Sequence, residues 1–543
     1  MTLEEVELEI RGNAPGYPAT DAREGKTLMA TVVTDDRPKT DAERLHELGY
    51  AQELLRRMSG FSNFAVSFTI ISILSGCLTL YGYGMNTGGP VVMSIGWPLV
   101  GIMVTLVGLS MAEIASAYPT AGGLYYWSAK LAKSNGPAWS WFTGWFNLLG
   151  QVAVTAGIDF GLAFFVTAFL NLQFGYPIDP PHIIGVYVVV LAIHGLLNTF
   201  GVRLVALLND ISVWWHVVGV LVIVGALAII PAHHQSVSFV FTKLVNNTGW
   251  GSSIYVFALG LLLAQYTFTG YDASAHMTEE TQDAARSAPR GIVMSIIVSL
   301  IAGWVLLLGV TFAIQNYSGE ATAGVPVAQI FIDAIGTTGA KLLLLIVIGA
   351  QFFCGMSSVT ANSRMIYAFS RDGALPGSTF WHKVNKRSRT PTNSIWFAAV
   401  GALILGLPYL WNPEAYAAVT SIAVIGLYIA YILPVILRLR QGDRFAAGPW
   451  HLGRWSTTVG VIATIWVAFI TVLFMLPPAS PVNLQTNFNY APLAVAVVLL
   501  FAGGWWFASA RNWFKGPRVQ GTPEELAAIE RELGEVGTAP AVR

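Results

Sequence analysis

Residues 61–85, FSNFAVSFTIISILSGCLTLYGYGM, form an apolar run without a charged side chain, and a small Ser75-Gly76 step lies near its middle. About 20 apolar residues are enough for a helix to cross the hydrocarbon core of a bilayer. Serine and glycine in the middle of such a run favour an interruption, where backbone N–H and C=O groups face the protein interior. This stretch therefore predicts a membrane helix that is broken half way.

The composition of the chain extends this prediction to most of its length. Of 543 residues, 54% are apolar and 11% are charged, and half of the charged residues lie in 1–59 and 511–543. A soluble domain is excluded by this composition, and the zero net charge excludes an electrostatic nucleic-acid binder. The two cysteines, Cys77 and Cys354, lie in apolar runs, which excludes a disulfide scaffold and a cysteine-rich metal site.

Twelve apolar runs of helical length follow one another between the charged ends. Their expected bounds are 61–85, 91–117, 137–170, 182–198, 203–230, 252–278, 290–315, 340–369, 394–410, 415–437, 456–476 and 491–510. Twelve spans are typical of a transporter, although a channel or a membrane enzyme fits the same count.

The basic residues predict how these spans are oriented. If both ends of the chain lie on one side, that side holds 28 of the 30 Lys and Arg residues, and only Lys243 and Lys341 face the other. Because basic loops stay in the cytoplasm, we expect both termini to be cytoplasmic and the spans to lie in the plasma (cell inner) membrane. Capping boxes at Thr40 and Thr522 predict a short helix in each tail.

A second interruption is expected in the sixth span, where 267–272 reads TFTGYD. Glycines in membrane helices often only permit close packing. Breaks in the first and sixth spans, however, match in position between two successive groups of five helices, which is the pattern of an inverted-repeat transporter. The expected fold is an all-α membrane protein with 12 helices, in which 60–230 and 231–438 are five-helix repeats. Helices 11 and 12 (439–510) follow, and the tails are 1–59 and 511–543.

Four separated motifs carry a resemblance to a known family. They are SGFSNF at 59–64, AEIASAYPTAGGLYYW at 112–127, GYDASAHMTEET at 270–281 and RDGALP at 371–376. With these motifs, the chain resembles the amino acid, polyamine and organocation (APC) transporter superfamily from about residue 49 to 511, and within it the branch of GABA, amino-acid and choline permeases. The resemblance implies a secondary transporter with a substrate site at the two breaks.

An amino-acid substrate requires hydrogen-bond donors for its carboxylate and acceptors for its ammonium group. Ser75, Gly76 and Cys77 are expected to offer freed N–H groups at the start of a half-helix, where the helix dipole favours an anion. Carbonyls at Phe268, Thr269 and Gly270 would accept from the ammonium group. The rings of Phe268 and Tyr271 would close over it, unless they only pack within the bundle.

Ionisable residues within the spans are candidates for coupling transport to an ion. Asp272 fits the acidic position after the sixth-helix break that the resemblance links to proton-coupled gating. His216 follows Gly201-Val202-Arg203 at the spacing at which proton-driven relatives carry a lysine beside the first break, and imidazole titrates in the physiological range. Ser357 and Ser358 lie where sodium-driven relatives offer hydroxyl ligands, so sodium is the alternative ion.

Other polar residues have less specific surroundings. Asp159 and Asp210 are possible gate residues, and His194 and His276 are expected to be structural. At the cytoplasmic end, Arg364 is expected to pair with Glu113 or Glu279 as an inner gate.

These observations predict a secondary active importer of amino acids or GABA-like amino acids, coupled to protons. The alternatives are a choline or polyamine cation transporter and a transporter-like nutrient sensor that does not move its ligand. An enzyme is not expected. No phosphate-binding glycine loop or metal motif is present, so neither a cofactor nor a metal is expected. The expected partners are a small amino acid or amine, the proton and membrane lipid, but no nucleic acid.

Overall fold

The structure, a computed structural model, describes residues 40–200, 202–385, 388–412, 415–483 and 488–538. Within this part the chain is almost entirely helical, as the apolar runs predict. Its only paired strands among the described residues are β1 (Thr87–Gly88) and β2 (Val245–Asn246), which are antiparallel. Residues 1–39, which hold most of the N-terminal tail, lie outside the described part, as do Gly201 and residues 539–543.

The first half of the chain contributes one short tail helix and the helices up to α10. These are α2 (Asp41–Glu47), α3 (Gly60–Ile71), α4 (Ile73–Thr79), α5 (Tyr81–Asn86), the π-helix η1 (Val92–Gly96), α6 (Trp97–Ala117), α7 (Gly123–Leu131), α8 (Gly136–Phe174), α9 (Pro180–Phe200) and α10 (Val202–Ile229).

The second half begins with the interrupted sixth span. Its elements are α11 (Val237–Thr242), α12 (Ser253–Gly260), α13 (Leu262–Thr267), α14 (Ala273–His276), η2 (Thr278–Glu280), α15 (Ala284–Phe312), α16 (Tyr317–Ala321), α17 (Pro326–Arg371), α18 (Ser378–Trp381), α19 (Thr392–Gly406), η3 (Leu407–Leu410) and α20 (Ala415–Gln441). The last elements are η4 (Gly442–Arg444), η5 (Gly453–Trp455), α21 (Ser456–Leu473), α22 (Ala491–Trp505), the π-helix η6 (Trp506–Ala510), α23 (Arg511–Trp513) and α24 (Pro523–Thr538).

Eleven of these helical segments are long and apolar enough to cross a membrane, among the described residues. The shorter apolar segment Ser253–Thr267 accounts for the sixth expected span, because the break at its end shortens it. The eighth expected span is part of a longer element, α17, which begins at Pro326. This helix bends at Gly336, which has a positive φ of 75° that glycine adopts without strain. An all-α membrane protein is therefore confirmed.

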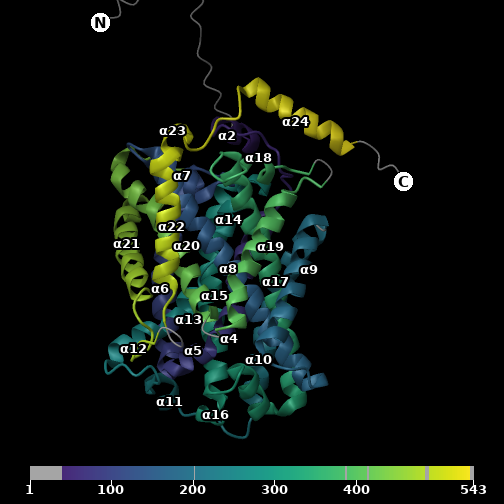
Figure 1. Cartoon of the computed structure of the whole chain (residues 1–543), viewed down its shortest axis with the longest axis vertical. Coiled ribbons are helices and arrows are strands. Elements are labelled where there is room, and N and C mark those ends of the chain that lie inside the picture. The colour runs from purple at the N-terminus through teal and green to yellow at the C-terminus, as the bar shows by residue number, and fades with distance from the viewer. Residues whose placement is uncertain (1–39, 201, 386–387, 413–414, 484–487, 539–543) are drawn as a thin grey trace, which may run out of the picture. The chain divides into compact units, whose positions relative to one another are not determined.

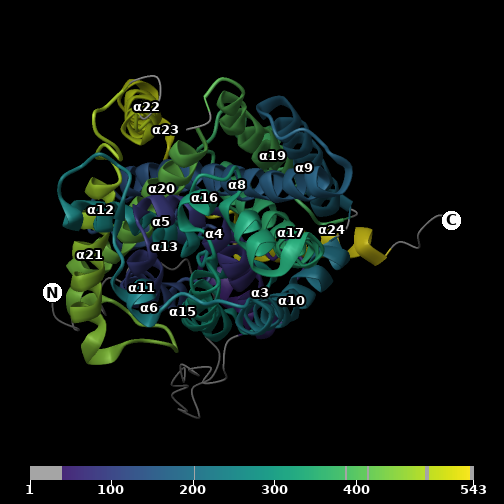
Figure 2. The same cartoon turned by 90° about the horizontal axis from the view of Figure 1, so that it is seen from below.

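The long helices run between two sides of the bundle (Figure 1). One side carries α2, α18 and α24, and we call it the tail side; the other carries α5, α11 and α16, and we call it the distal side. Seen from the distal side, α4 and α13 lie in the middle of the bundle, whereas α21 and α22 lie at its edge (Figure 2). Helix α8 packs along α17 and α20, and α15 packs along α3 and α6. The broken spans are thus enclosed by other helices.

The described parts of the two tails bind each other. Both predicted capping boxes form, since Thr40 caps α2, and Thr522 exchanges hydrogen bonds with Glu525 at the start of α24. The Gln520 N–H donates to the Gly49 carbonyl at 2.9 Å, and the Ala51 N–H donates to Gln520 Oε1 at 2.8 Å. We call residues 40–59 and 516–530 the tail clasp.

The tail clasp also holds the end of the sixth span. Gln52 Nε2 donates to the Glu279 carbonyl at 2.7 Å, and the Met58 N–H donates to the Glu280 carbonyl at 2.9 Å. Beneath it, Asp372 is buried and accepts hydrogen bonds from the Tyr50 hydroxyl, the Tyr125 hydroxyl and the Arg518 N–H. Burial raises the pKa of Asp372, although the neighbouring Arg371 acts in the opposite direction. A carboxylate outside the spans therefore ties both tails to the bundle.

Candidate functional site

The first span is broken at Ser72. Helix α3 ends at Ile71 and α4 begins at Ile73, and Ser72 between them has the left-handed conformation (φ 37°, ψ 83°). An interruption of this span was predicted, but its position differs from the expected Ser75-Gly76-Cys77 step. That step lies inside α4, so the prediction of non-helical backbone there is wrong.

The hydrogen bonds around Ser72 explain this difference. The N–H groups of Ser75 and Gly76 both donate to the Ser72 carbonyl, at 2.8 and 2.9 Å, and are not free. The first N–H groups of any helix lack partners within the helix. In α4 these are the amides of Ile73 and Leu74, directly before the expected Ser75-Gly76-Cys77 step.

The sixth span is broken where the sequence predicts. Helix α13 ends at Thr267 and α14 begins at Ala273, and Gly270 between them has a φ of 89°. The Phe268 carbonyl accepts a hydrogen bond from Tyr428, and the Gly270 N–H donates to the Tyr431 hydroxyl at 3.3 Å. Both tyrosines belong to α20, which therefore supports the open backbone of this break.

The two breaks lie against each other. Ser67 Oγ, one turn before Ser72, donates to the Tyr271 carbonyl at 2.9 Å. A Cβ on Gly76 would come within 2.9 Å of the Thr267 Cα, and a Cβ on Gly270 would overlap Ile70. Because only glycine allows this approach, the backbone of each interrupted segment packs directly on residues of the other in the middle of the bundle.

The two aromatic residues of the sixth break point to different neighbours. The Phe268 ring packs on Trp97 of α6, with centroids 4.5 Å apart. The Tyr271 ring packs on Tyr431 at 4.9 Å. The Tyr271 hydroxyl is buried and has no hydrogen-bond partner among the described residues, which leaves it available to a polar ligand.

Further buried polar atoms near the sixth break also lack partners within the described part of the chain. They are the Tyr266 hydroxyl and both amide atoms of Gln265, on α13. A Cβ on Gly157 of α8 would be in contact with the Tyr266 hydroxyl, so this group lies between α8 and α13. Unpaired polar groups at full burial are costly unless a ligand or water satisfies them. They therefore mark a polar site beside the breaks.

Asp272 is the charged member of this site. It is fully buried, and it accepts hydrogen bonds from Tyr431 and from Gln151 Nε2, each at 2.7 Å. His276 Nδ1 lies 2.9 Å from the Ala121 carbonyl and must donate to it, since a carbonyl only accepts. The other ring nitrogen, Nε2, lies 3.2 Å from Asp272 Oδ2. The Asn147 amide nitrogen, Nδ2, lies 3.3 Å from the same ring nitrogen.

His216 lies beside the first break, where the sequence places it. Its Nδ1 donates to the Ser212 carbonyl at 2.7 Å, and its Nε2 is 2.7 Å from the Ser72 hydroxyl. The residue with the left-handed backbone is thus bonded directly to a titratable ring. The side chain of Arg203, on which the spacing argument starts, lies outside what the structure describes.

Ser357 and Ser358 of α17 already have partners. The Ser357 hydroxyl donates to Asn209 and to the Phe353 carbonyl, and the Ser358 hydroxyl is 2.8 Å from that of Thr155. On the same helix, the Cys354 thiol donates to the Ile70 carbonyl at 3.2 Å. This part of α17 therefore packs closely against the first break.

The ion pairs at the tail side differ from those expected. Arg364 pairs with Glu280 at 2.8 Å, whereas Glu113 pairs with Arg438 at 3.1 Å and Glu279 pairs with Arg371 at 3.2 Å. The predicted pairing of Arg364 with Glu113 or Glu279 is therefore wrong. Glu113 projects from α6 towards α20 and α21, while Glu279 and Glu280 both face α17, where Glu279 meets Arg371 at its end and Glu280 meets Arg364 two turns earlier.

Two further predicted residues lie elsewhere. Asp159 of α8 is buried against His194 of α9, 3.0 Å away. Asp210 of α10 accepts a hydrogen bond from Ser62 at 3.3 Å, near the tail-side end of α3. Neither carboxylate contacts the sixth break through a hydrogen bond in the described residues.

Cavities approach the breaks from both sides. On the distal side, a recess of about 890 Å³ reaches Thr79, one turn from Ser75, and we call it the distal recess. On the tail side, a cavity of about 350 Å³ is lined by Asn198, Asn209, Thr360, Glu280 and Arg364, among others, and we call it the tail-side cavity.

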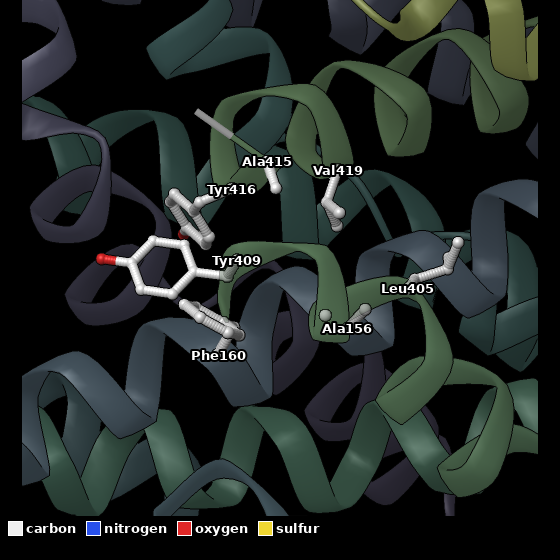
Figure 3. Close-up of a pocket in the computed structure, with 8 residues that line it drawn as sticks. Ala156, Phe160, Leu405, Tyr409, Ala415, Tyr416 and Val419 are labelled. Atoms are coloured by element: carbon white, nitrogen blue, oxygen red, sulfur yellow. The ribbon is translucent and has the colours of Figure 1, made fainter. Parts of the chain in front are cut away.

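A third pocket, of about 210 Å³, lies between α8, η3 and α20. The rings of Phe160, Tyr409 and Tyr416 gather at one end of it, while Ala156, Val419 and Leu405 line the rest (Figure 3). Its lining has no charged group, so it does not match a zwitterion.

Sequence reasoning missed Tyr428, Tyr431 and Gln151, which hold the sixth break and Asp272. Two tyrosines three residues apart, on one face of an otherwise aliphatic span, are the available signal for α20. An aromatic pair in an apolar run is too common to assign a site by itself.

Comparison with known proteins agrees with this architecture. The sequence model of the family described as Amino acid permease matches residues 58–501. The chain is 46% identical over 497 residues to the amino-acid permease BAT1 of Arabidopsis thaliana, which covers 87% of this chain and 95% of that protein. It is 31% identical over 489 residues to the GABA-specific permease of Saccharomyces cerevisiae, which covers 88% of this chain and 86% of the yeast protein. A chain with two packed helix breaks and matches of this extent belongs to the amino acid permease family, within the APC superfamily of membrane transporters.

Proposed function

We propose that this permease imports amino acids or GABA-like amino acids across the plasma membrane, with its tail side in the cytoplasm. The orientation is supported by the sequence, because the alternation of the expected spans puts 28 of the 30 basic residues on the same side as the two ends of the chain. We also propose that 60–230 and 231–438 are inverted repeats, since the first membrane span of each is interrupted by a helix break.

The observation that carries the proposal is the contact between the two breaks. At the first break, the amides of Ile73 and Leu74 at the positive end of α4 suit a carboxylate. The side chains and backbone of Ser75, Gly76 and Cys77 follow on the same turn. At the sixth break, Phe268, Thr269, Gly270 and Tyr271 supply carbonyls and rings for an ammonium group.

Protons are the coupling ions that we favour, through His216 and Asp272. When His216 is neutral, Ser72 donates to its Nε2; when it is protonated, the direction of this hydrogen bond reverses and a positive charge lies at the first break. Asp272 and His276 hold a second proton position beside the sixth break. Each break then carries one titratable group that bonds to it directly.

Sodium is the less favoured ion. Ser357 and Ser358 would be its hydroxyl ligands, but both hydroxyls already engage Asn209 and Thr155. Glu113, with its partner Arg438, and Arg364, with its partner Glu280, are proposed as gating pairs on the tail side.

Uptake into proteoliposomes tests this function. A panel of labelled amino acids, GABA, choline and putrescine is offered with an inward proton gradient, with a sodium gradient, or with neither. We expect an amino acid to accumulate with the proton gradient alone. Accumulation of choline or putrescine instead would assign a cation transporter, and binding without any uptake would assign a sensor.

A further inference from the structure

Asp159 and His194 form a buried pair that transport by the two breaks does not explain. Both side chains have no solvent exposure, and His194 Nδ1 lies 3.0 Å from Asp159 Oδ1. The outer oxygen of the pair, Asp159 Oδ2, and its outer nitrogen, His194 Nε2, have no hydrogen-bond partner among the described residues. A pair that served structure alone would be expected to satisfy these atoms.

The neighbouring helix leaves room for this pair. A Cβ on Gly355 of α17 would overlap Asp159 Oδ1 and would lie 2.7 Å from His194 Cε1. Gly355 follows Cys354, whose thiol binds the Ile70 carbonyl just before the first break. The pair and the segment just before the break at Ser72 therefore both contact the same turn of α17.

The other ionisable groups that face Asp159 are Tyr187 of α9, Tyr266 of α13 and Cys354 of α17. Tyrosine and cysteine are neutral at physiological pH, and no Lys or Arg pairs with Asp159 in the described residues. The Phe352 ring covers one face of His194 at 4.6 Å. Among these facing groups, Asp159 and His194 therefore form the only carboxylate–imidazole pair.

The tail-side cavity begins one helical turn from the pair along α9. Asn198, one turn after His194 on α9, donates to the His194 carbonyl at 3.0 Å and accepts from Thr360. Asn198 and Thr360 both line the tail-side cavity, together with Glu280 and Arg364. Asn198 bonds to the backbone of His194 and not to its ring, so a proton leaving Nε2 would cross about one helical turn to reach this polar cavity.

From this arrangement we propose that Asp159 and His194 bind a transported proton and release it through the tail-side cavity. With His194 protonated, the pair has no net charge. The proton on Nε2, the nitrogen without a partner, passes to water in the cavity, while the Nδ1–H remains bonded to Asp159. Release leaves one negative charge beside the first break, which weakens the binding of the substrate carboxylate. The proposal rests on the proton coupling proposed above.

The test compares Asp159→Asn and His194→Gln with wild type in proteoliposomes, using the labelled amino acid that wild type accumulates best. Each variant keeps roughly the size of the side chain but replaces its ionisable group by an amide. We expect exchange without a gradient to persist and to lose the part of its pH dependence that this pair contributes. Accumulation driven by a gradient of one pH unit should fall by about tenfold, the amount that one coupled proton supports.

Tyr187→Phe is the matched control, because it removes a hydroxyl that faces Asp159 but binds the Ala402 carbonyl. It should keep the wild-type pH profile. Gly355→Ala, which displaces the carboxylate without removing it, should resemble Asp159→Asn. Infrared difference spectra between acidic and neutral pH give a readout that does not depend on uptake, and they should lose a carboxyl or imidazole band in both pair variants.

The outcomes separate this proposal from the proposed function. If wild type is proton-driven and both variants keep its pH profile and its infrared difference bands, the pair is not the proton site, although proton-coupled import stands. If wild type does not respond to a proton gradient, proton coupling is wrong. The infrared difference spectra then still decide whether the pair titrates, and unchanged spectra in both variants would overturn the proposal.

Discussion

Single glycines set how closely the interrupted spans approach each other. A Cβ on Gly76 would come within 2.5 Å of Thr267 Oγ1 and 2.7 Å of its Cγ2. Both atoms belong to the last residue of α13, directly before the sixth break. The α4–α13 contact therefore depends on a position that has no side chain.

Replacing Gly76 by valine should separate α4 from α13 and abolish substrate binding. Overpacking of this kind costs about 1 to 3 kcal/mol, so the protein should still fold and reach the membrane. Binding is measured with the purified protein by scintillation proximity, using the amino acid found in the uptake panel. Gly225→Val is the control, because a Cβ on Gly225 of α10 meets nothing within 4 Å. Normal binding by Gly76→Val would exclude this contact from the substrate site.

His216 gives a second test at the level of one residue. His216→Ala removes the ring that binds Ser72, and with it the proposed positive charge at the first break. Accumulation against a gradient should therefore fall more strongly than binding does. Uptake and binding are measured on the same preparation. Full proton-driven accumulation by this variant would place the proton elsewhere, with Asp272 as the next residue to replace.

The elements of this fold follow from the sequence to different degrees. The apolar runs predict the spans, since each must bury its backbone polar groups in a helix. The sixth break was predictable because Gly270 adopts a positive φ that glycine accepts without strain. The position of the first break was not, because Ser72 is not a glycine and its hydrogen-bond partner, His216, lies 144 residues later in the chain. The ion-pair partners of Glu279 and Glu280 were likewise not predictable, because they depend on the conformation of η2.

The tail clasp can be tested through Asp372. Asp372→Asn places an amide donor against the hydroxyl and N–H donors of Tyr50, Tyr125 and Arg518, which costs about 1 to 3 kcal/mol. We expect a lower melting temperature and faster proteolysis of the C-terminal tail. Tyr83→Phe, which removes a hydroxyl on the distal side, is the control for loss of a tyrosine hydrogen bond.

The same variant has a predicted pH dependence. Burial raises the pKa of Asp372, so wild type gains stability below the ordinary pKa of an aspartate and loses it as the pH rises through the raised value. Asparagine does not titrate. The difference in melting temperature between wild type and Asp372→Asn should therefore narrow as the pH rises from about 4 towards neutrality. A difference that widens over this range would contradict the assignment.

At the scale of the whole molecule, recesses approach the paired breaks from the distal side and from the tail side. A zwitterion bound between them would use the amide end of one break and the carbonyls of the other. An amino acid should then compete much better than the amine formed by its decarboxylation. Leaving the amides of Ile73 and Leu74 unpaired costs about 1 to 3 kcal/mol, or roughly 5-fold to 150-fold in affinity.

Competition against uptake of the labelled amino acid measures this ratio. The amide of the same amino acid serves as a control that keeps the size of the carboxylate but not its charge. Choline or putrescine competing as well as the amino acid would overturn the carboxylate assignment. Asp159 and Asp272 would then be the anionic groups to test as partners of a cation.

The N-terminal part of the tail clasp binds the end of the sixth span, and the C-terminal part binds the N-terminal part, so the motion of that span is observable from outside the membrane. Cys77 and Cys354 are buried, so thiols introduced at Glu47 and Glu524 can be labelled selectively with a fluorescent donor and acceptor. If the tail side opens by moving η2, the hydrogen bonds of Gln52 and Met58 to it must break. Energy transfer between the two dyes would then record each opening of a single transporter in time, without a probe inside the bundle.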